Sequence, residues 1–440
     1  MKIRASIRIL SVIALILSFS SCSLIDFFSA DGLIRPPRLT GENAALQTAV
    51  VESVGTDINL YTPIAGEHRA SYILFDMNND NNDEAVVFYS QVSNSSVVHM
   101  HLLSSMNGKW FSVADIIGSG TEVYEVAFFN VDNFQGTEIA VTWSLDDSKR
   151  EKTLSLYKVA SLDANSDSLS SVATVQIADY VCFDIDSDAV NELLYFYYQD
   201  LSKGDKVSVR LLDYSVQEEK FVPLSEIQFL HEVSSFAAIS FEKSNNDYLI
   251  YVDCISGSGS YFTKLIVYDY ENSALYLPDS DKNDIYELSL RNLDILCSDF
   301  NGDGELEIPS QISYDESYTV GAPEGVSYYL TFIEWFQYDN SDLSSVGKYY
   351  FNVADGFRMK IDSLYDDYYF VYDYLNGVTQ VRLRNFDEEN NVVFSVARAE
   401  DSDVIYPLIQ EKDGFDIVIT AKGEKLRITR DYVLKLIENI

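Results

Sequence analysis

Short apolar runs and acidic segments alternate along this chain at nearly equal intervals. Four nine-residue acidic segments begin at residues 76, 130, 184 and 299, so successive starts differ by 54, 54 and 115 residues. Each segment stands between two runs rich in β-branched and aromatic residues, a pattern that indicates two strands joined by a loop. Because the last interval is about two periods, we expect a fifth, altered copy near residue 240. Equal spacing of one such unit predicts a repeat architecture.

Further strand pairs are predicted between the acidic segments. Residues 97–103 and 110–117 flank Met106-Asn-Gly-Lys109, a sequence typical of a hairpin turn. About four short strands in each period is the composition of a β-propeller blade. The sequence therefore predicts a mainly β fold, with an about five-bladed β-propeller over residues 60–345. The other predicted pairs are 153–159 with 171–177, 207–214 with 221–227, and 263–270 with 274–277.

Different patterns flank the predicted propeller. Residues 40–54 carry one apolar stripe and end at Gly55, which predicts a short helix. Beyond residue 345 the period is lost, and the pattern predicts several strands and a last helix capped by Thr429. We expect residues 346–440 to form a small α+β domain. The alternative is that residues 346–400 form a sixth, degenerate blade.

The N-terminus has the pattern of a secretion signal. Lys2, Arg4 and Arg8 precede an apolar run over residues 9–19, which is too short to cross a membrane. Small residues before Cys22 resemble the lipobox of bacterial lipoproteins, which implies that Cys22 is lipidated. Residues 1–21 would then be a signal peptide and residues 22–59 a lipid-anchored tether with the short helix. The expected location is the extracytoplasmic face of the cell membrane; the alternative is an ordinary signal peptide.

Composition limits the partners. The chain has 440 residues, 47% of them apolar, and a formal net charge of -38. A strongly negative field repels nucleic acid, so we expect no nucleic-acid partner. Beyond Cys22 the cysteines are Cys182, Cys254 and Cys297. Their odd number argues against a full disulfide framework and favours small buried residues.

The acidic segments place oxygen donors at positions 1, 3, 5 and 9, an arrangement that suits a hard cation such as calcium. In the 130 segment Phe134 replaces the third donor, so we expect that loop to be empty. The alternative for all four is a turn that its own side chains stabilise. The candidate calcium ligands are Asp299, Asn301, Asp303, Glu305 (through its carbonyl) and Glu307; Asp184, Asp186, Asp188 and Glu192; and Asp76, Asn78, Asp80 and Glu84.

The 299 segment, Asp-Phe-Asn-Gly-Asp-Gly-Glu-Leu-Glu, resembles the calcium loops of FG-GAP/VCBS-type repeats, and the 76 and 184 segments match them in part. With the flanking Leu33–Glu42 segment, the chain resembles a group of uncharacterised bacterial lipoproteins with such repeats. The resemblance implies an integrin-like propeller and a surface location, and no known activity.

No catalytic residues are predicted. His99 and His101 lie on one face of a strand, but the nearby sequence offers no third metal ligand. Tyrosine-rich stretches at 195–198, 314–318 and 365–374 could stack on sugars, although packing between strands is the favoured interpretation. We expect a module that binds a protein or a cell-wall glycan. The alternatives are an extracellular polysaccharide hydrolase or lyase and a structural subunit of an envelope complex.

Overall fold

A computed structural model describes residues 42–132, 136–145, 150–159, 162, 169–199, 206–244, 247–278, 284–323, 330–339, 342–364, 366–384, 391–398 and 415–439. Within these ranges the strands form six sheets of four or five strands each. The predicted signal segment, Cys22 and the tether up to residue 41 lie outside them. None of the described helices is long and apolar enough to span a bilayer.

The first sheet follows the predicted N-terminal helix. Helix α3 (Glu42–Val54) ends at Gly55, whose φ of 90° is a conformation that glycine adopts readily. Leu46 and Val50 of α3 are buried against the sheet. The sheet contains β1 (Ile58–Tyr61), β2 (Tyr72–Phe75), β3 (Glu84–Gln91), β4 (Asn94–Met106) and β5 (Lys109–Ile117).

The next three sheets are four-stranded antiparallel meanders, as the sequence predicts. The predicted fifth copy near residue 240 is the first hairpin of the fourth sheet. The second sheet contains β6 (Glu122–Phe129), β7 (Glu138–Ser144), β8 (Lys152–Val159) and β9 (Leu169–Ile177). The third contains β10 (Asp179–Phe183), β11 (Glu192–Tyr198), β12 (Val207–Ser215) and β13 (Lys220–Gln228), and the fourth β14 (Ser235–Lys243), β15 (Asp247–Ile255), β16 (Tyr261–Asp269) and β17 (Ala274–Tyr276).

The last two sheets bring distant parts of the chain together. Thr429 caps the last helix as predicted, but the chain continues from Ile437 as a strand that pairs with β22. The predicted boundary at 345/346 lies inside β21. The fifth sheet contains β18 (Glu307–Gln311), β20 (Thr331–Asp339), β21 (Asp342–Asn352), β22 (Phe357–Lys360) and β27 (Ile437–Asn439), and α4 (Ile285–Ser289) precedes it. The sixth contains β19 (Tyr318–Val320), β23 (Tyr368–Asp373), β24 (Val378–Leu383), β25 (Val392–Arg398) and β26 (Phe415–Ile419), with helices α5 (Ala421–Lys425) and α6 (Arg430–Leu436).

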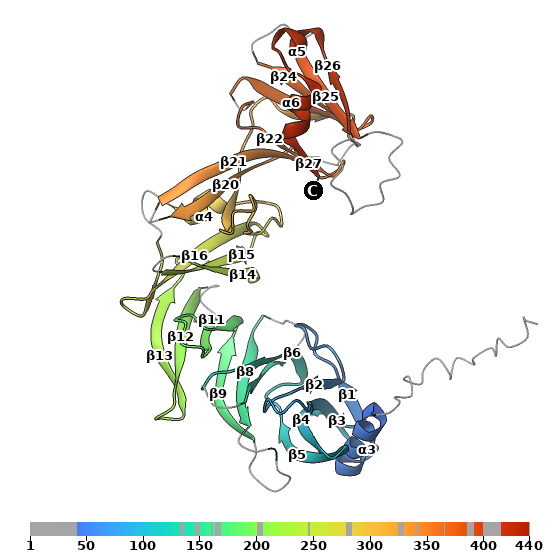
Figure 1. The fold of residues 1–440 in the computed structure, drawn as a ribbon, viewed down its shortest axis with the longest axis vertical. Coiled ribbons are helices and arrows are strands. Elements are labelled where there is room, and N and C mark those ends of the chain that lie inside the picture. Colours follow the sequence, from blue (N-terminus) through green and yellow to red (C-terminus); the bar gives the residue numbers. More distant parts are fainter. Residues whose placement is uncertain are drawn as a thin grey trace, which may run out of the picture.

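Successive sheets follow one another along an arc (Figure 1). In this view α3 and the first sheet lie at one end, and the sixth sheet with α5 and α6 lies at the other. The mainly β class, built from four-stranded antiparallel sheets of the propeller type, is confirmed. The arc leaves its ends apart, so closure into a ring is not seen, and the number of blades stays a prediction.

Packing between neighbouring sheets explains which strands are most apolar. All seven residues of β7, a strand inside its sheet, are buried, whereas the outer strand β13 has only exposed and half-buried positions, which alternate over its second half. A strand covered on both faces has no solvent side and so loses the alternation. One core cluster combines Phe196 of the third sheet with Ile266 of the fourth, so the core continues from sheet to sheet.

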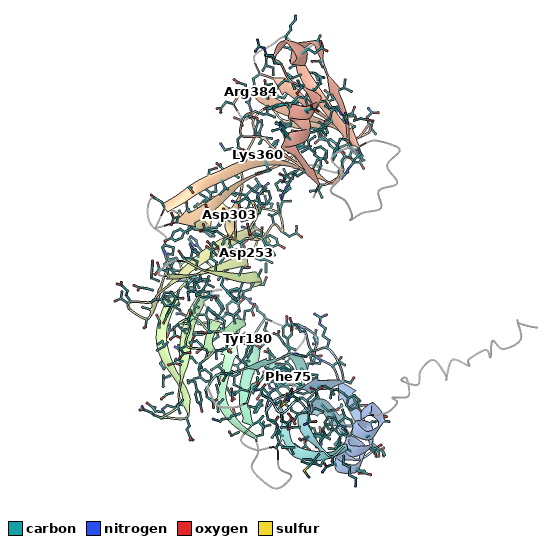
Figure 2. The ribbon with its side chains drawn as sticks, in the orientation of Figure 1. Phe75, Tyr180, Asp253, Asp303, Lys360 and Arg384 are labelled. Carbon is teal, nitrogen blue, oxygen red and sulfur yellow. The ribbon has the colours of Figure 1, made fainter. Side chains whose placement is uncertain are left out.

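A buried ion pair holds the segment between the fourth and fifth sheets. Asp253, labelled near the middle of the arc in Figure 2, accepts a hydrogen bond from Arg291 Nη2 at 2.6 Å, and both side chains are at most 1% exposed. The same carboxylate accepts hydrogen bonds from Thr263 Oγ1 (2.7 Å) and from the backbone N–H of Cys297 (2.8 Å). Cys254 and Cys297 are buried free thiols.

Removing one partner of this pair should destabilise the chain strongly. We expect Arg291→Ala to lower the free energy of unfolding by about 3–5 kcal/mol, because Asp253 is left buried and unpaired. Lys220→Ala is the matched control, since Lys220 and Glu218 form an exposed pair whose loss costs about 0–1 kcal/mol. Urea unfolding measures both, and equal effects of the two variants would contradict this interpretation.

Candidate metal centres in the acidic loops

The four acidic loops occupy one position in the fold. The 76 loop joins β2 to β3, the 130 loop joins β6 to β7, and the 184 loop joins β10 to β11. The 299 loop leads into β18 after a bridge between Ser298 and Glu307. Three of the loops therefore precede an inner strand of their sheet, as expected for copies of one unit, whereas the 299 loop precedes β18, an outermost strand of the fifth sheet.

Three of the loops share one turn geometry. In the 184 loop the backbone N–H groups of Asp188 and Ala189 donate to the two oxygens of Asp184, both at 3.1 Å. The fourth and sixth residues have positive φ, which is unfavourable for Ser187 and Ala189 and natural for Gly302 and Gly304. The corresponding bonds to the first acid are Asp80 N and Asn81 N to Asp76, and Asp303 N and Gly304 N to Asp299.

The ninth residue of all four loops is a glutamate buried beneath the turn. Each accepts a hydrogen bond from the backbone N–H of the second loop residue, at distances of 2.6 to 3.0 Å. Burial is the largest cause that raises the pKa of each carboxyl, and it raises that of Glu192 to about 8. Burial thus disfavours the carboxylate, and a bound cation would favour it. The four residues are Glu84, Glu138, Glu192 and Glu307.

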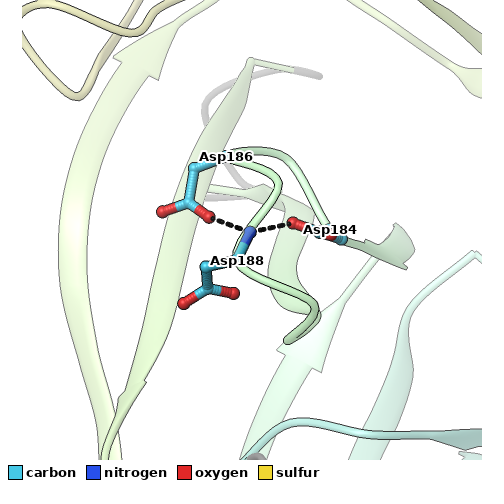
Figure 3. Close-up of side chains that lie close together, drawn as sticks. All are labelled: Asp184, Asp186 and Asp188. Carbon is cyan, nitrogen blue, oxygen red and sulfur yellow. Dashed lines mark hydrogen bonds between the residues drawn. The ribbon is translucent and has the colours of Figure 1, made fainter.

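The 184 loop concentrates the most unneutralised charge. One oxygen from each of Asp184, Asp186 and Asp188 lies within 4.8 Å of the others (Figure 3). Burial raises the pKa of Asp186, and the charges of Asp188 and Asp184 raise it further. Asp213 of β12 adds another negative charge beside Glu192. Carboxylate oxygens are the donors that calcium prefers.

The 299 loop brings its donors together in a different way. Oxygens of Asp299, Asp303 and Glu307 lie within 4.8 Å of one another. The amide nitrogen of Asn301 donates to Asp303 at 2.8 Å and to Glu307 at 2.7 Å, so a donor already stands among these carboxylates. Asn301 Oδ1 accepts from the backbone N–H of Asp303 at 2.8 Å, which fixes the orientation of the amide. Glu305 is exposed, and its side chain bonds Gln337.

The 76 loop gathers fewer acids. Asn78 donates to Asp80 at 3.2 Å, and Ser104 donates to Glu84 at 3.1 Å. Among the described residues, close groups of three acidic side chains occur in the 184 and 299 loops. The structure therefore brings the predicted ligands of those two loops together more closely than those of the 76 loop.

A lysine ammonium from a neighbouring strand lies beside the acids of the 130 loop. Lys158 of β8 forms an ion pair with Asp132, and Asp132 is 3% exposed. Burial lowers the pKa of Lys158, but the hydrogen bond and charge of Asp132 outweigh it and raise that pKa overall. The pair Ile139–Tyr157 places Lys158 opposite Glu138. In the third sheet Leu193 pairs with Leu212, so the residue opposite Glu192, which corresponds to Lys158, is Asp213.

Lys158 gives a physical reason for the predicted emptiness of the 130 loop. An ammonium beside Asp132 and Glu138 supplies the positive charge that a cation would supply. Residues 133–135, which include Phe134, lie outside the described residues. Lys158 could have been found from the sequence only through its position opposite Glu138, the ninth residue of the loop. That position depends on how β7 pairs with β8.

The loops also connect neighbouring sheets. Each contact comes from the eighth loop residue, whose backbone N–H faces the preceding sheet. Thr137 N donates to Met77 O at 2.9 Å, and Asn191 N donates to Asn130 O at 2.8 Å. Leu306 N donates to the carboxylate of Glu242 on β14 at 2.5 Å. A cation held in such a loop would therefore stiffen contacts between sheets as well as its own turn.

A groove opens beside the fifth and sixth sheets. Its volume is about 770 Å³, and its described lining consists of amide, hydroxyl, tyrosine and apolar side chains. Tyr318 of β19 is 47% exposed, whereas Tyr314 is buried and stacks on Phe332 at 4.5 Å between ring centroids. Of the predicted tyrosine stretch 314–318, one end is therefore packed and the other reaches solvent. The amide and hydroxyl lining residues are Asn292, Gln311, Ser313, Ser317, Thr319 and Thr331.

No protein-family model matches the chain, and no curated protein matches its sequence. Solved structures with similar folds include a GH43 β-1,3-galactosidase, at 8% identity and a TM-score of 0.28 over 65% of this chain and 96% of that one. The β-propeller domain of the trilobed protease from Pyrococcus furiosus has 13% identity and a TM-score of 0.26 over 76% and 80% of the two chains. A putative 6-phosphogluconolactonase from Bacteroides uniformis has 13% identity and a TM-score of 0.31 over 75% and 93%. Similarities this distant say nothing about the activity of this chain.

Replacing Lys158 should create a need for a cation. We expect Lys158→Ser, which copies Ser104 of the first sheet, to lower the free energy of unfolding by about 1–3 kcal/mol, because Asp132 and Glu138 lose their charged partner. Added calcium should restore part of this loss. Lys220→Ser, in an exposed pair with Glu218, is the control. Thermal unfolding with and without calcium measures the effect; a variant as stable as the parent chain would show that the ammonium is dispensable.

Proposed function

We propose that the chain is a lipoprotein, anchored through Cys22 at the extracytoplasmic face of the membrane, whose calcium-loop sheets form a rigid binding module. The observation that carries this proposal is the repetition of one acidic turn at the same position of several sheets, with backbone hydrogen bonds from loop to loop. A series of sheets linked in this way suits the presentation of a surface. The N-terminal sequence pattern supports the anchor.

Calcium is the cofactor that the loops support best. The oxygens of the 184 loop are close enough to surround one ion, and the buried Glu192 faces the same charges. Oxygen donors without nitrogen or sulfur favour a hard cation. In the 299 loop the same role falls to Asp299, Asp303 and Glu307. The ions would be structural, since the loops support the sheets.

The groove beside Tyr318 supports a neutral glycan as the ligand. Amides and hydroxyls can exchange hydrogen bonds with sugar hydroxyls, and an exposed tyrosine ring can stack on a pyranose face. The described lining carries no carboxylate, although the chain contains 69 Asp and Glu residues. This local neutrality favours an uncharged ligand over a cationic peptide.

The runner-up function is a polysaccharide hydrolase. Glycoside hydrolysis commonly requires two carboxyl groups about 5–10 Å apart across the scissile bond. The groove beside Tyr318 has amides and hydroxyls in place of such carboxyl groups. These groups suit binding of a sugar better than its hydrolysis. A structural subunit of an envelope complex is the third candidate, with the α+β region near the C-terminus as its docking surface.

The effect of Asp186→Asn on the stability of the chain should depend on whether calcium is present. Without calcium we expect an equal or higher melting temperature, because the change removes one of three converging charges. With calcium at a hundred times its Kd, the parent chain should gain about 2.7 kcal/mol per site, and the variant should lose most of the gain at this loop. Asp416→Asn, at an exposed position of β26, is the control. If calcium leaves the melting temperature of the parent chain unchanged, the metal assignment is contradicted.

Tyr318→Ala should weaken binding of neutral oligosaccharides by about 1–3 kcal/mol, the loss expected when an exposed stacking ring is removed. Tyr276→Ala, a tyrosine of similar exposure on β17, should leave binding unchanged. Isothermal titration of the calcium-loaded chain with neutral cell-wall oligosaccharides measures both. Equal effects of the two changes would place the ligand elsewhere.

A further inference from the structure

A second cavity adjoins the groove that contains Tyr318. Its volume is about 410 Å³, within the range of about 300–1,000 Å³ that is typical of small-ligand pockets. The two cavities share four lining residues, so a ligand of more than one sugar residue can contact both. The shared residues are Asn292, Gln311, Ile312 and Ser313, and the described lining of the second cavity adds Ser260, Leu290 and Arg291.

The side chain of Gln311 supplies hydrogen-bond donors where the two cavities meet. Its Oε1 accepts the backbone N–H of Asn292 at 2.8 Å. Because a backbone N–H can only donate, this contact fixes which end of the Gln311 amide faces Asn292. The other end, Nε2, has no hydrogen-bond partner among the described residues. Its two N–H groups are therefore free to bind an acceptor on a ligand.

Charge favours a neutral acceptor over an anion. Arg291 is the one charged residue in the described lining of the second cavity, and it is 2% exposed. Its Nη2 donates to Asp253 at 2.6 Å and its Nη1 to the carbonyl of Ser289 at 2.8 Å, so its charge is already compensated. The net charge of -38 repels anions as well. A neutral carbonyl oxygen therefore suits Gln311 better than a carboxylate or a phosphate.

We propose that the second cavity binds the N-acetyl group of an acetamido sugar, in a neutral glycan whose neighbouring residue stacks on Tyr318, an assignment that rests on the glycan binding proposed above. The carbonyl oxygen of the N-acetyl group would accept from Gln311 Nε2. The hydroxyl of Ser260 can accept its N–H, and Leu290 and Ile312 provide apolar surface for its methyl group. Each part of the group thus has a partner of matching chemistry.

A sugar with a plain hydroxyl in this place lacks both the carbonyl and the methyl group. It would leave the Gln311 donors without their acceptor and the apolar part of the cavity unfilled. A site built to hydrogen-bond one group of its ligand discriminates against an analogue that lacks the group. The second cavity would therefore select among neutral glycans, whereas the stacking ring of Tyr318 accepts any of them.

The test compares two neutral β-1,4-linked tetrasaccharides, one of N-acetylglucosamine and one of glucose, which differ only in the acetamido groups. Isothermal titration of the calcium-loaded chain measures both affinities. We expect the acetamido glycan to bind about tenfold or more tightly than the glucose glycan, because it alone satisfies the Gln311 donors. This comparison requires no variant, so it does not depend on whether a variant folds.

Gln311→Glu removes the donor and keeps the contact within the fold, since a carboxylate oxygen can still accept the N–H of Asn292. In this variant the preference for the acetamido glycan should fall to about twofold or less. Gln217→Glu adds the same charge in the exposed turn between β12 and β13, and it should keep the full preference. Circular dichroism checks that both variants retain the fold.

Equal affinities for the two glycans, both weakened by Tyr318→Ala, would overturn the acetamido assignment and leave the proposed glycan binding intact. If neither glycan binds, both proposals fail. A preference that Gln311→Glu leaves unchanged would also overturn the assignment, because the donor would then have no part in it. A capped neutral peptide that binds more tightly than the acetamido glycan would identify peptide carbonyls as the ligand instead.

Discussion

A glutamate carboxylate buried beneath a tight turn is the constraint that governs this molecule. It holds the backbone N–H of the second loop residue in all four acidic loops, so the direction in which the strand after each loop begins depends on it. A charged group in such a place needs a compensating partner. The chain supplies different ones: the hydroxyl of Ser104, the ammonium of Lys158 and the amide of Asn301; in the 184 loop further acids surround the glutamate, and the ammonium of Lys243 bonds Ser187 Oγ.

These partners explain why copies of one turn can differ in their demand for a cation. Lys158 brings a positive charge with the polypeptide, whereas Asp213 at the corresponding place adds a negative one. The 184 loop would then depend most on calcium, although the 299 sequence matches the calcium pattern more fully. Glycines at 302 and 304 make the 299 turn easy to form, while Ser187 and Ala189 adopt positive φ at a cost. A match to the loop pattern therefore indicates how easily the backbone forms the turn, more than how strongly the carboxylates require a cation.

Local patterns predicted most of the elements. Helix α3, its end at Gly55, the hairpin at Asn107-Gly108 and the cap at Thr429 depend on neighbours in sequence, and the structure contains each. Features that depend on pairing between strands were missed. They include the parallel pairing of β19 with β23, the return of Ile437 to β22, and the position of Lys158 opposite Glu138. The sequence thus located the acidic loops in the fold, and it did not locate the side chains that neighbouring strands place beside them.

Contacts between neighbouring loops connect each turn to the next sheet of the arc. Because Thr137 and Asn191 bond the loop of the preceding sheet, a change in one turn reaches the next sheet directly. Aromatic rings beside the loops extend this contact, with Phe75 stacked on Phe128 at 4.1 Å and Phe183 on Phe241 at 4.8 Å. Stability in such a series is approximately a sum of unit and neighbour terms. An ion bound in one turn would therefore act on two sheets.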